Sequence, residues 1–443
     1  MQENRYRAYN LRNFKDLPQI QNLSPQAIEA IEVVGRVLPF KANNYVVDEL
    51  IDWDNIPNDP MFTLTFPRKE MLSPSHYKQV LNMLDMDTRD ETYKEKINKI
   101  RMKLNPNPAG QEHNVPTMMG DKLHGMQHKY RETVLFFPSQ GQTCHAYCTF
   151  CFRWPQFSGM NDLKFAMRES DLLHKYLRKN KQVTDVLFTG GDPLTASANV
   201  LSNYIEPLLT DEFAHIRTIR IGSKALSYWP YRFLTDKDAD NLIELFERVT
   251  KAGKNLAYQA HFNHPKELST DAVKLAIERI QNTGAQIRTQ SPLLRKINNH
   301  PDIWAEMWQK QVDLGCIPYY MFVARDTGSK AFFEVPLDKA WDIFRKAYTQ
   351  VSGIARTVRG PSMSAFPGKV IVTGVADVKG EKVFVLKFLQ CRNPKLVGIP
   401  FFAKYDAKAT WLDQLKPAFG ETEFFYEKDN LIGVEVEEDV LWE

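Results

Sequence analysis

Residues 144–151 read Cys-His-Ala-Tyr-Cys-Thr-Phe-Cys and closely follow an apolar run, TVLFFPS, at residues 133–139. The stretch places Cys144, Cys148 and Cys151 in a C-x3-C-x2-C spacing. Soft thiolate ligands of this kind select iron–sulfur clusters, zinc or copper(I). Three thiolates on a cluster of four irons leave one iron open to a substrate or cofactor, whereas a purely structural site closes its fourth position. The spacing therefore predicts a [4Fe-4S] cluster with one open iron.

Zinc is the main alternative metal for this loop, with His145 as a fourth ligand. Structural zinc sites usually take their ligands from two separated short pairs of residues, whereas the other cysteines, Cys316 and Cys391, each stand alone. The five cysteines are an odd number and three of them crowd one loop, so no disulfide framework is expected. A non-catalytic zinc-binding protein stays open as an alternative.

Composition and charge are those of a globular enzyme. The chain has 443 residues, 43% of them hydrophobic and 25% charged, and these shares are ordinary for a folded protein. Its net charge of +3 is too small to predict binding to nucleic acid. The first 16 residues are polar and charged, so we expect no signal peptide. No run of about 18 apolar residues occurs, so we expect no membrane span and a cytoplasmic protein.

Three parts can be distinguished along the chain. Residues 1–128 are predicted to be helical, beginning with a helix that Ser24 caps and that runs to Val37. Residues 129–352 alternate strand-like and helix-like segments, the pattern of an α/β fold with a parallel sheet. Six βα units predict a partial (β/α)6 TIM-type barrel. The six strand-like runs lie at residues 133–139, 185–189, 218–222, 256–262, 286–290 and 318–323.

Residues 353–443 are predicted to be a β-rich region that closes the barrel. Runs at 369–375 and 383–389, joined through residues 377–380, indicate a β-hairpin. Packing on the core and contact between copies of the chain in a homo-oligomer are both expected roles for the two flanking regions.

Polar residues gather where the predicted strands end. In barrels of this type the chemistry lies at the carboxyl ends of the strands. Glycines such as Gly190 and Gly191 allow the backbone to approach a ligand closely and to offer it free N–H groups. Besides the cysteine loop and the two glycines, the strand ends carry Asp192, Lys224, His261, Gln290 and Arg325.

The chain resembles the radical S-adenosylmethionine enzymes, and among them the lysine 2,3-aminomutase family, from about residue 124 to residue 375. The resemblance is carried by CHAYCTFC, LFTGGDPL, IRIGSKA, HFNHP, TQSPLLRKIN and PYY. It implies that S-adenosylmethionine binds the open iron and is cleaved to a 5′-deoxyadenosyl radical, which abstracts a substrate hydrogen. A flavodoxin or ferredoxin is the implied type of reductant. By similarity, the S-adenosylmethionine contacts are Gly190, Gly191, Asp192, Lys224, His261 and Gln290.

The chain departs from that family at the pyridoxal phosphate site. The lysine that forms a Schiff base in the family is expected at about Ser362, and serine cannot form one. Lys369 is expected to project from its strand into solvent. These substitutions predict an enzyme without pyridoxal phosphate. A pyridoxal-phosphate-dependent amino-acid 2,3-aminomutase, using Lys369 or binding the cofactor noncovalently, stays open as an alternative.

The predicted substrate pocket also differs in charge. Arg153 matches a position that binds the substrate carboxylate, and Lys129 with Tyr130 matches a basic–aromatic pair. Arg325 and Arg359 correspond to two aspartates that hold the lysine ammonium group, so the sign of the pocket is reversed. The sequence therefore predicts a small carboxylate- or phosphate-bearing substrate, bound by Arg153, Arg325, Arg359 and Tyr130.

Overall fold

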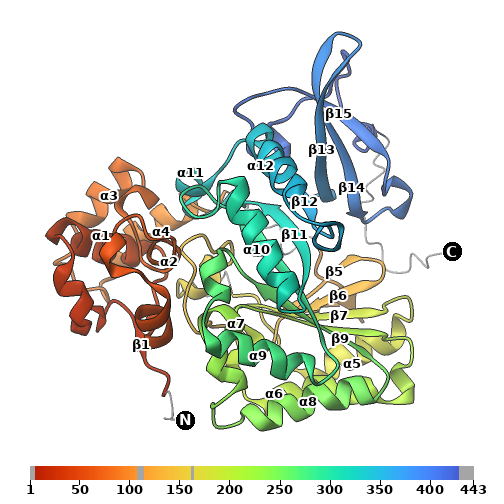
Figure 1. Cartoon of the computed structure of the whole chain (residues 1–443), viewed down its shortest axis with the longest axis horizontal. Coiled ribbons are helices and arrows are strands. Elements are labelled where there is room, and N and C mark those ends of the chain that lie inside the picture. Colours follow the sequence, from red (N-terminus) through yellow and green to blue (C-terminus); the bar gives the residue numbers. More distant parts are fainter. Residues whose placement is uncertain (1–4, 107–113, 161–163, 429–443) are drawn as a thin grey trace.

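The computed structural model describes residues 5–106, 114–160 and 164–428, which form a mixed α/β structure around one large sheet (Figure 1). The sheet has eleven strands in the order β15-β14-β13-β12-β11-β10-β9-β8-β7-β6-β5. Over the described residues it is open, with β5 (Met126–Tyr130) and β15 (Pro400–Lys404) at its edges. The predicted α/β class is therefore confirmed, while the partial barrel stays a prediction.

Six strands in the middle of the sheet are parallel and follow one another in chain order. Each lies within or around one of the six predicted runs, so these strand predictions are confirmed. Parallel strands all end at the same edge of a sheet, which brings the loops that follow them together. The six strands are β6 (Thr133–Phe136), β7 (Asp185–Phe188), β8 (Thr218–Ser223), β9 (Asn255–His261), β10 (Gln286–Leu293) and β11 (Ile317–Val323).

Helices pack against the outer face of this parallel part, as Figure 1 shows for the lower half of the molecule. Apolar side chains repeat every three to four residues along each helix and are buried against the strands, as in α8, where Leu242, Leu245, Phe246 and Val249 are fully buried. The main helices are α5 (Ser170–Lys179), α6 (Ala198–Ile205), α8 (Ala239–Lys251), α9 (Asp271–Gln281), α10 (Pro301–Asp313) and α12 (Leu337–Thr349).

The N-terminal region lies to one side of the sheet and is largely helical (Figure 1). Its helices are α1 (Pro25–Val37), α2 (Pro60–Thr65), α3 (Pro74–Leu81) and α4 (Glu91–Lys103). The Ser24 hydroxyl accepts a hydrogen bond from the Ala27 N–H, which confirms the predicted cap. The core of this region also contains Trp154, Trp229 and Phe333 from the strand-bearing part. The boundary proposed at residue 128 stays a prediction.

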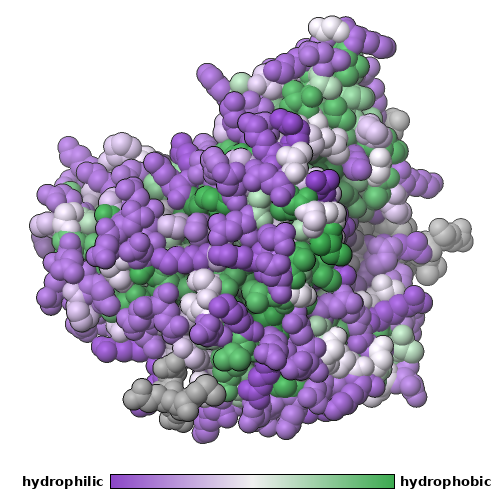
Figure 2. Space-filling view, in the orientation of Figure 1, coloured by the Kyte–Doolittle hydropathy of each residue, from purple (hydrophilic) through white to green (hydrophobic). Residues whose placement is uncertain are grey.

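The C-terminal strands extend the sheet beyond β11. The hairpin β13 (Gly368–Val378) and β14 (Glu381–Cys391) confirms the predicted one, and Lys379 and Gly380 at its tip both have positive φ. Figure 2 shows hydrophobic side chains gathered over this hairpin on an otherwise mostly hydrophilic face. The sequence did not predict β12 (Arg359–Ser364), which pairs in parallel with β11. The end of the predicted region, residues 429–443, lies outside the described residues.

Among the described helices, none combines the length and apolar composition that a membrane crossing requires.

Candidate active site

A cavity of about 580 Å³ opens at the carboxyl ends of the parallel strands. Its wall is built from the cysteine loop after β6, from the ends of β7 to β11, and from side chains of β12 and β13. Of the residues predicted for the site, only Arg359 is absent from this wall. The predicted residues that line the cavity are Tyr130, Cys144, Cys148, Cys151, Arg153, Gly190, Gly191, Asp192, Lys224, His261, Gln290 and Arg325.

The three clustered cysteines are free thiols that share this cavity. Burial raises the pKa of Cys148 to about 11 and that of Cys151 to about 12, and repulsion between the thiolates adds to the effect at Cys151. Burial likewise raises the pKa of Cys144 well above its usual range. Without a metal these groups are therefore protonated at neutral pH, and metal binding would release their protons.

The donor set fits a four-iron cluster. In the described residues, no three His, Cys, Asp or Glu side chains converge in the way that ligands of a single metal ion do. A four-iron cube takes each thiolate on a different iron, so it does not require such convergence. His145, the fourth ligand in the zinc alternative, is buried beside the cysteines, and its Nδ1 has no hydrogen-bond partner in the described structure. Burial lowers the pKa of His145 to about 3, so the ring is neutral.

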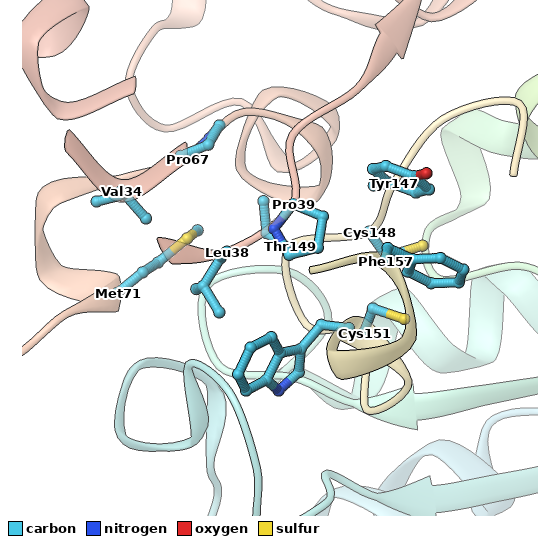
Figure 3. Close-up of a pocket in the computed structure, with 11 residues that line it drawn as sticks. Val34, Leu38, Pro39, Pro67, Met71, Tyr147, Cys148, Thr149, Cys151 and Phe157 are labelled. Atoms are coloured by element: carbon cyan, nitrogen blue, oxygen red, sulfur yellow. The ribbon is translucent and has the colours of Figure 1, made fainter. Parts of the chain in front are cut away.

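An apolar wall lies behind the cysteine loop. Figure 3 shows Val34, Leu38 and Met71 of the N-terminal region facing Cys148 and Cys151 across a narrow crevice of about 10 Å³. This volume is about that of one water-sized probe, and a site for an ordered water also needs polar partners. The back of the cysteine loop is therefore narrow and lined mainly by apolar side chains, and apolar surroundings strengthen electrostatic interactions.

The glycine pair lies against the cysteine loop. Gly190 has φ +146°, and a Cβ atom there would lie 2.3 Å from Gln142 Nε2. A Cβ at Gly191 would lie 2.5 Å from the Thr143 carbonyl oxygen, and the neighbouring Asp192 N–H donates to that oxygen at 2.6 Å. The backbone of these glycines thus lies close to the loop that carries Cys144. This contact places the loop next to the end of β7.

The Asp192 carboxylate is already hydrogen-bonded within the protein. One oxygen accepts from the Ser223 hydroxyl and the Lys224 N–H, both at 2.9 Å, and the other from the Leu194 N–H at 3.0 Å. The side chain is only 2% exposed, and this burial raises its pKa while the hydrogen bonds lower it. Asp192 therefore ties the end of β7 to the end of β8.

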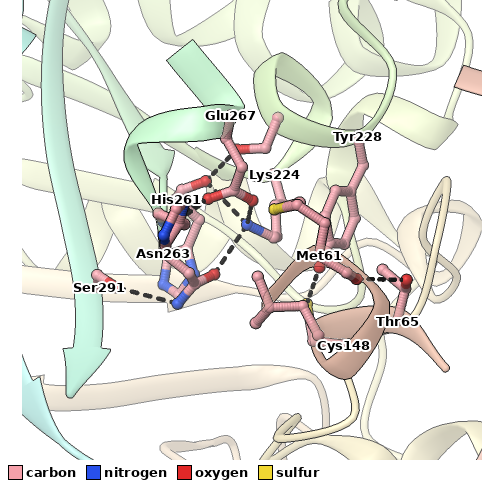
Figure 4. Close-up of polar contacts among 12 residues, drawn as sticks. Met61, Thr65, Cys148, Lys224, Tyr228, His261, Asn263, Glu267 and Ser291 are labelled. Atoms are coloured by element: carbon pink, nitrogen blue, oxygen red, sulfur yellow. Dashed lines mark hydrogen bonds and ion pairs between the residues drawn. The ribbon is translucent and has the colours of Figure 1, made fainter. Parts of the chain in front are cut away.

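Lys224 is the centre of a polar network at the ends of β8 and β9 (Figure 4). Its Nζ donates to Glu267 Oε1 at 2.6 Å, to Asn263 Oδ1 at 2.9 Å and to the His261 carbonyl at 3.2 Å. Glu267 is fully buried, so its carboxylate neutralises the lysine inside the protein. The charge of Lys224, a predicted S-adenosylmethionine contact, is therefore paired within the protein.

The same network reaches the cysteines. The Cys148 thiol donates to the Tyr228 hydroxyl at 3.5 Å, and the Lys224 Nζ lies 4.3 Å from the centre of the Tyr228 ring. Burial lowers the pKa of the neighbouring His261 to about 3, so its imidazole is a neutral group in the cavity wall.

Two arginines supply positive charge to the cavity. The guanidinium carbon of Arg153 lies 4.4 Å from the Phe137 ring centre and 5.0 Å from that of Phe152, and no ion pair holds it in the described residues. Arg325 donates through Nη1 to the Ser364 carbonyl at 3.2 Å. Its Nε has no hydrogen-bond partner in the described structure and forms an ion pair with an Asp326 oxygen at 3.7 Å. Both guanidinium groups can therefore accept an anionic ligand.

Lys369 also lines the cavity, so the expectation that it projects into solvent is wrong. Its Nζ lies 4.1 Å from the centre of the Tyr320 ring, and within the described chain its amine has no hydrogen-bond or ion-pair partner. Burial lowers the pKa of Lys369 well below its usual value, and the charges of Arg220, Lys129 and Arg359 lower it further. The pairing of β12 with β13 sets Lys369 opposite Ser364, another lining residue.

Two other residues lie elsewhere than the sequence indicated. Ser362, taken as the counterpart of the family lysine, is fully buried outside the cavity wall and donates to the Met321 carbonyl at 3.4 Å. Arg359 lies outside the wall too, with its guanidinium carbon 4.3 Å from the Tyr319 ring centre and 4.6 Å from that of Tyr320. Arg359 therefore packs on two tyrosine rings instead of lining the cavity.

Arg220 is a site residue that the sequence analysis missed. It lies in β8 between Ile219 and Ile221, which are fully buried against the helices. The Arg220 side chain lies on the opposite face of the strand and lines the cavity. An ion pair with Asp185 of β7 holds its guanidinium group. The alternation of charged and apolar residues in TIRIGS was the signal, because successive side chains of a strand point to opposite faces.

The curated relatives that match the chain include proteins named as L-lysine 2,3-aminomutases. No family model matches the chain. A protein of Aquifex aeolicus, provisionally named as an L-lysine 2,3-aminomutase, is 31% identical over 399 residues, which are 90% of this chain and 93% of that protein. The L-lysine 2,3-aminomutase of Bacillus subtilis is 24% identical over 79% of this chain and 64% of its own length. Among solved structures, a radical SAM methyltransferase from Sphaerobacter thermophilus aligns with 53% of this chain and 68% of its own, at 13% identity and a TM-score of 0.38.

Proposed function

Because the chain belongs to the lysine 2,3-aminomutase family of radical S-adenosylmethionine enzymes, we propose that it abstracts a hydrogen atom from a small anionic substrate in the basic cavity. The observation that carries the proposal is that three cysteines, a glycine pair and two arginines without carboxylate hydrogen bonds share one cavity. For the parallel strands we propose the partial (β/α)6 barrel that the sequence predicted.

The cofactors would lie at the cysteine end of the cavity. Cys144, Cys148 and Cys151 would hold a [4Fe-4S] cluster, which together with S-adenosylmethionine supplies the reducing electron and a carbon radical when bound. His261 and Gln290 line the cavity and are proposed to contact S-adenosylmethionine directly, together with the backbone of Gly190 and Gly191. Asp192 and Lys224, whose polar atoms already have partners, would support these contacts by positioning the strand ends. A flavodoxin or ferredoxin is the reductant we propose.

The substrate would be held by Arg153 and Arg325. Each is buried with few polar contacts, and a buried guanidinium group binds a carboxylate or phosphate through short, charge-assisted hydrogen bonds. The cavity wall also carries Lys129, which donates to the Ala365 carbonyl at 3.1 Å, and Tyr130. A substrate with two anionic groups, such as an amino acid with an acidic side chain, would satisfy both arginines at once.

The position of Lys369 favours the pyridoxal phosphate alternative over an enzyme without that cofactor. A neutral amine is the form that attacks a carbonyl group, and burial among cations favours the neutral form of Lys369. Arg220 and Lys129 are close enough to Lys369 to lower its pKa, and such cations suit the phosphate group of the cofactor. We therefore propose that Lys369 holds pyridoxal phosphate, which when bound would activate the amino group of the substrate for migration.

A cofactor census on anaerobically purified and reconstituted protein tests both parts of this proposal. We expect about four irons and four sulfides per chain, together with one pyridoxal phosphate that borohydride fixes to Lys369. Lys369→Ala should lose the fixed cofactor and keep the iron. Lys382→Ala is the matched control, because Lys382 lies on the same hairpin with an exposed side chain.

Each result of the census has a separate meaning. About one zinc with no iron would contradict the radical enzyme and support the zinc alternative. Four irons with no pyridoxal phosphate would contradict the role proposed for Lys369. Hydrogen abstraction from an anionic substrate without pyridoxal phosphate would then be the remaining function.

A further inference from the structure

The N-terminal region holds the backbone of the cysteine loop. The Tyr147 N–H donates to the Lys41 carbonyl at 2.7 Å, and the Thr149 N–H donates to the Leu64 carbonyl at 2.9 Å. The His145 carbonyl accepts from the Tyr6 hydroxyl at 2.7 Å and from Asn43 at 3.2 Å. Alternate residues of the loop are thus fixed by residues that lie about a hundred positions earlier in the chain.

Lys41 adds a charge to these backbone contacts. Its Nζ donates to Thr143 Oγ1 at 2.9 Å, next to Cys144, and lies 4.8 Å from the ring centre of Tyr147. The Tyr147 ring in turn stacks on Phe157, with 4.9 Å between the ring centres. These contacts place the ammonium group beside the loop that carries the thiols.

The charge of Lys41 has no acidic partner in the part of the chain that the structure describes. Two other cations near the cysteines are paired, Lys224 with Glu267 at 2.6 Å and Arg232 with Asp238 at 2.7 Å, whereas Arg153 beside Cys151 also lacks an ion pair in the described residues. Burial lowers the pKa of Lys41, and the negative charge of Cys144 opposes this shift. The field of Lys41 therefore acts on the cysteine loop, through surroundings that are apolar on one side.

We propose that Lys41 raises the reduction potential of the cluster held by Cys144, Cys148 and Cys151, as a charge supplied by the N-terminal region and not as a ligand. The inference rests on the proposed function, because it needs a redox-active cluster. Reduction transfers one electron from the external reductant to the cluster and makes it more negative by one charge. A nearby cation without an acidic partner stabilises this reduced state more than the oxidised state.

The test is a redox titration of the reconstituted cluster in Lys41→Met, followed by electron paramagnetic resonance without S-adenosylmethionine. We expect unchanged iron and sulfide content and a midpoint shifted to more negative potential. At a fixed potential the ratio of reduced to oxidised cluster should fall about tenfold, which corresponds to about 59 mV for one electron. Lys41→Arg should restore the midpoint of the unmodified protein, because it restores the charge.

The matched control is Lys254→Met. Lys254 is also partly buried, but it lies just before the start of β9, away from the cavity end of the strands. Its amine donates to the Phe213 and Ile216 carbonyls. If Lys41→Met loses iron, Lys41→Gln carries the test, since it removes the charge and keeps a donor for Thr143. A midpoint unchanged in iron-loaded Lys41→Met and Lys41→Gln, or an equal shift in Lys254→Met, would overturn the inference. Failure of the unmodified protein to bind four irons would instead overturn the proposed function.

Discussion

At the scale of single residues, Arg325 and Arg359 differ in their position relative to the cavity. Both were predicted to bind substrate, but only Arg325 lies in the cavity wall, while Arg359 packs on Tyr319 and Tyr320. A hydrogen bond to a charged group contributes about 1.5–3 kcal/mol. Arg325→Gln should therefore weaken binding of an anionic substrate by about 10- to 100-fold, measured by calorimetry or as KM.

Arg359→Gln is the control for this prediction. It removes the same charge from a position outside the cavity wall, so we expect at most a small change in substrate binding. S-adenosylmethionine cleavage without substrate should persist in both variants. Equal losses of substrate affinity in the two variants would show that charge alone, and not contact in the cavity, governs recognition.

Lys129 gives a prediction about pH. Burial, followed by repulsion from Arg325 and Arg392, lowers the pKa of Lys129 to about 7 in the folded protein, against about 10.4 in an unfolded chain. Between these two values the unfolded chain binds more protons, so this group makes stability rise with pH. The loss of folding stability caused by burying charged Lys129 is fully present below pH 7 and disappears as the pH approaches 10.

Lys129→Met should remove that pH dependence. In cofactor-free protein we expect the variant to gain unfolding free energy relative to the unmodified protein at pH 6.5, by an amount on the order of a few kcal/mol, and to gain none near pH 10. Denaturant titrations at several pH values measure the difference. Lys122→Met, at an exposed position of β4 (Asp121–Lys122), is the control, and identical profiles for the two variants would contradict the prediction.

At the scale of elements, the cysteine loop depends on β2 (Ala42–Asn43) of the N-terminal region. The fully buried Asn43 side chain donates to the His145 and Tyr228 carbonyls and accepts from the Val46 N–H. Asn43→Ala removes the hydrogen bonds of Asn43 to the Tyr228 carbonyl and the Val46 N–H, at about 1–3 kcal/mol for each buried group left without a partner. The His145 carbonyl loses one hydrogen bond and keeps the one from the Tyr6 hydroxyl. We expect a lower melting temperature and less iron retained after reconstitution.

Asn44→Ala is a control one residue away. The Asn44 side chain also makes hydrogen bonds, to the Arg7 N–H and the Arg5 carbonyl, but at exposed positions where water can replace them. We expect its melting temperature and iron content to stay close to those of the unmodified protein. Retention of iron in Asn43→Ala equal to that in Asn44→Ala would show that β2 is not needed to hold the loop.

At the scale of the whole molecule, the N-terminal region and the parallel sheet share a hydrophobic core. Trp154, Trp229 and Phe333 of the sheet-bearing part belong to the same hydrophobic cluster as the side chains of α1, and Trp229 and Trp154 are 0% and 2% exposed. Removal of the N-terminal region would expose the apolar side chains of this shared core to water, so the N-terminal region and the parallel sheet should unfold together. Calorimetry of the full chain should show one transition that includes both, whereas a chain that begins at residue 115 should be insoluble or unfolded.

A separate low-temperature transition of the N-terminal region would contradict this prediction. Limited proteolysis offers a second measurement, since cleavage between residues 104 and 117 should not release a folded C-terminal fragment. A stable fragment that keeps its iron would show that the N-terminal region is dispensable for the cluster.

Local patterns in the sequence predicted much of this structure. The six parallel strands, the Ser24 cap and the β13–β14 hairpin follow from periodicity and turn residues, which act over a few neighbouring positions. The cysteine spacing predicted a cluster at this loop, since three soft ligands within eight residues leave few alternatives, and that assignment stays a prediction. Chemistry at the ends of parallel strands followed from topology, which brings those ends to one edge.

Other features depended on contacts between residues far apart in the chain. Lys369 could be assigned to the cavity only after β12 was seen to extend the sheet, because one residue of strand register decides which face a side chain occupies. The neutralisation of Lys224 by Glu267 and the contact of Lys41 with Thr143 join residues separated by 43 and 102 positions. The sequence by itself thus determined the elements and the position of the cysteine loop, whereas tertiary packing decided which charges remain available to a ligand, since pairing and burial depend on distance in space.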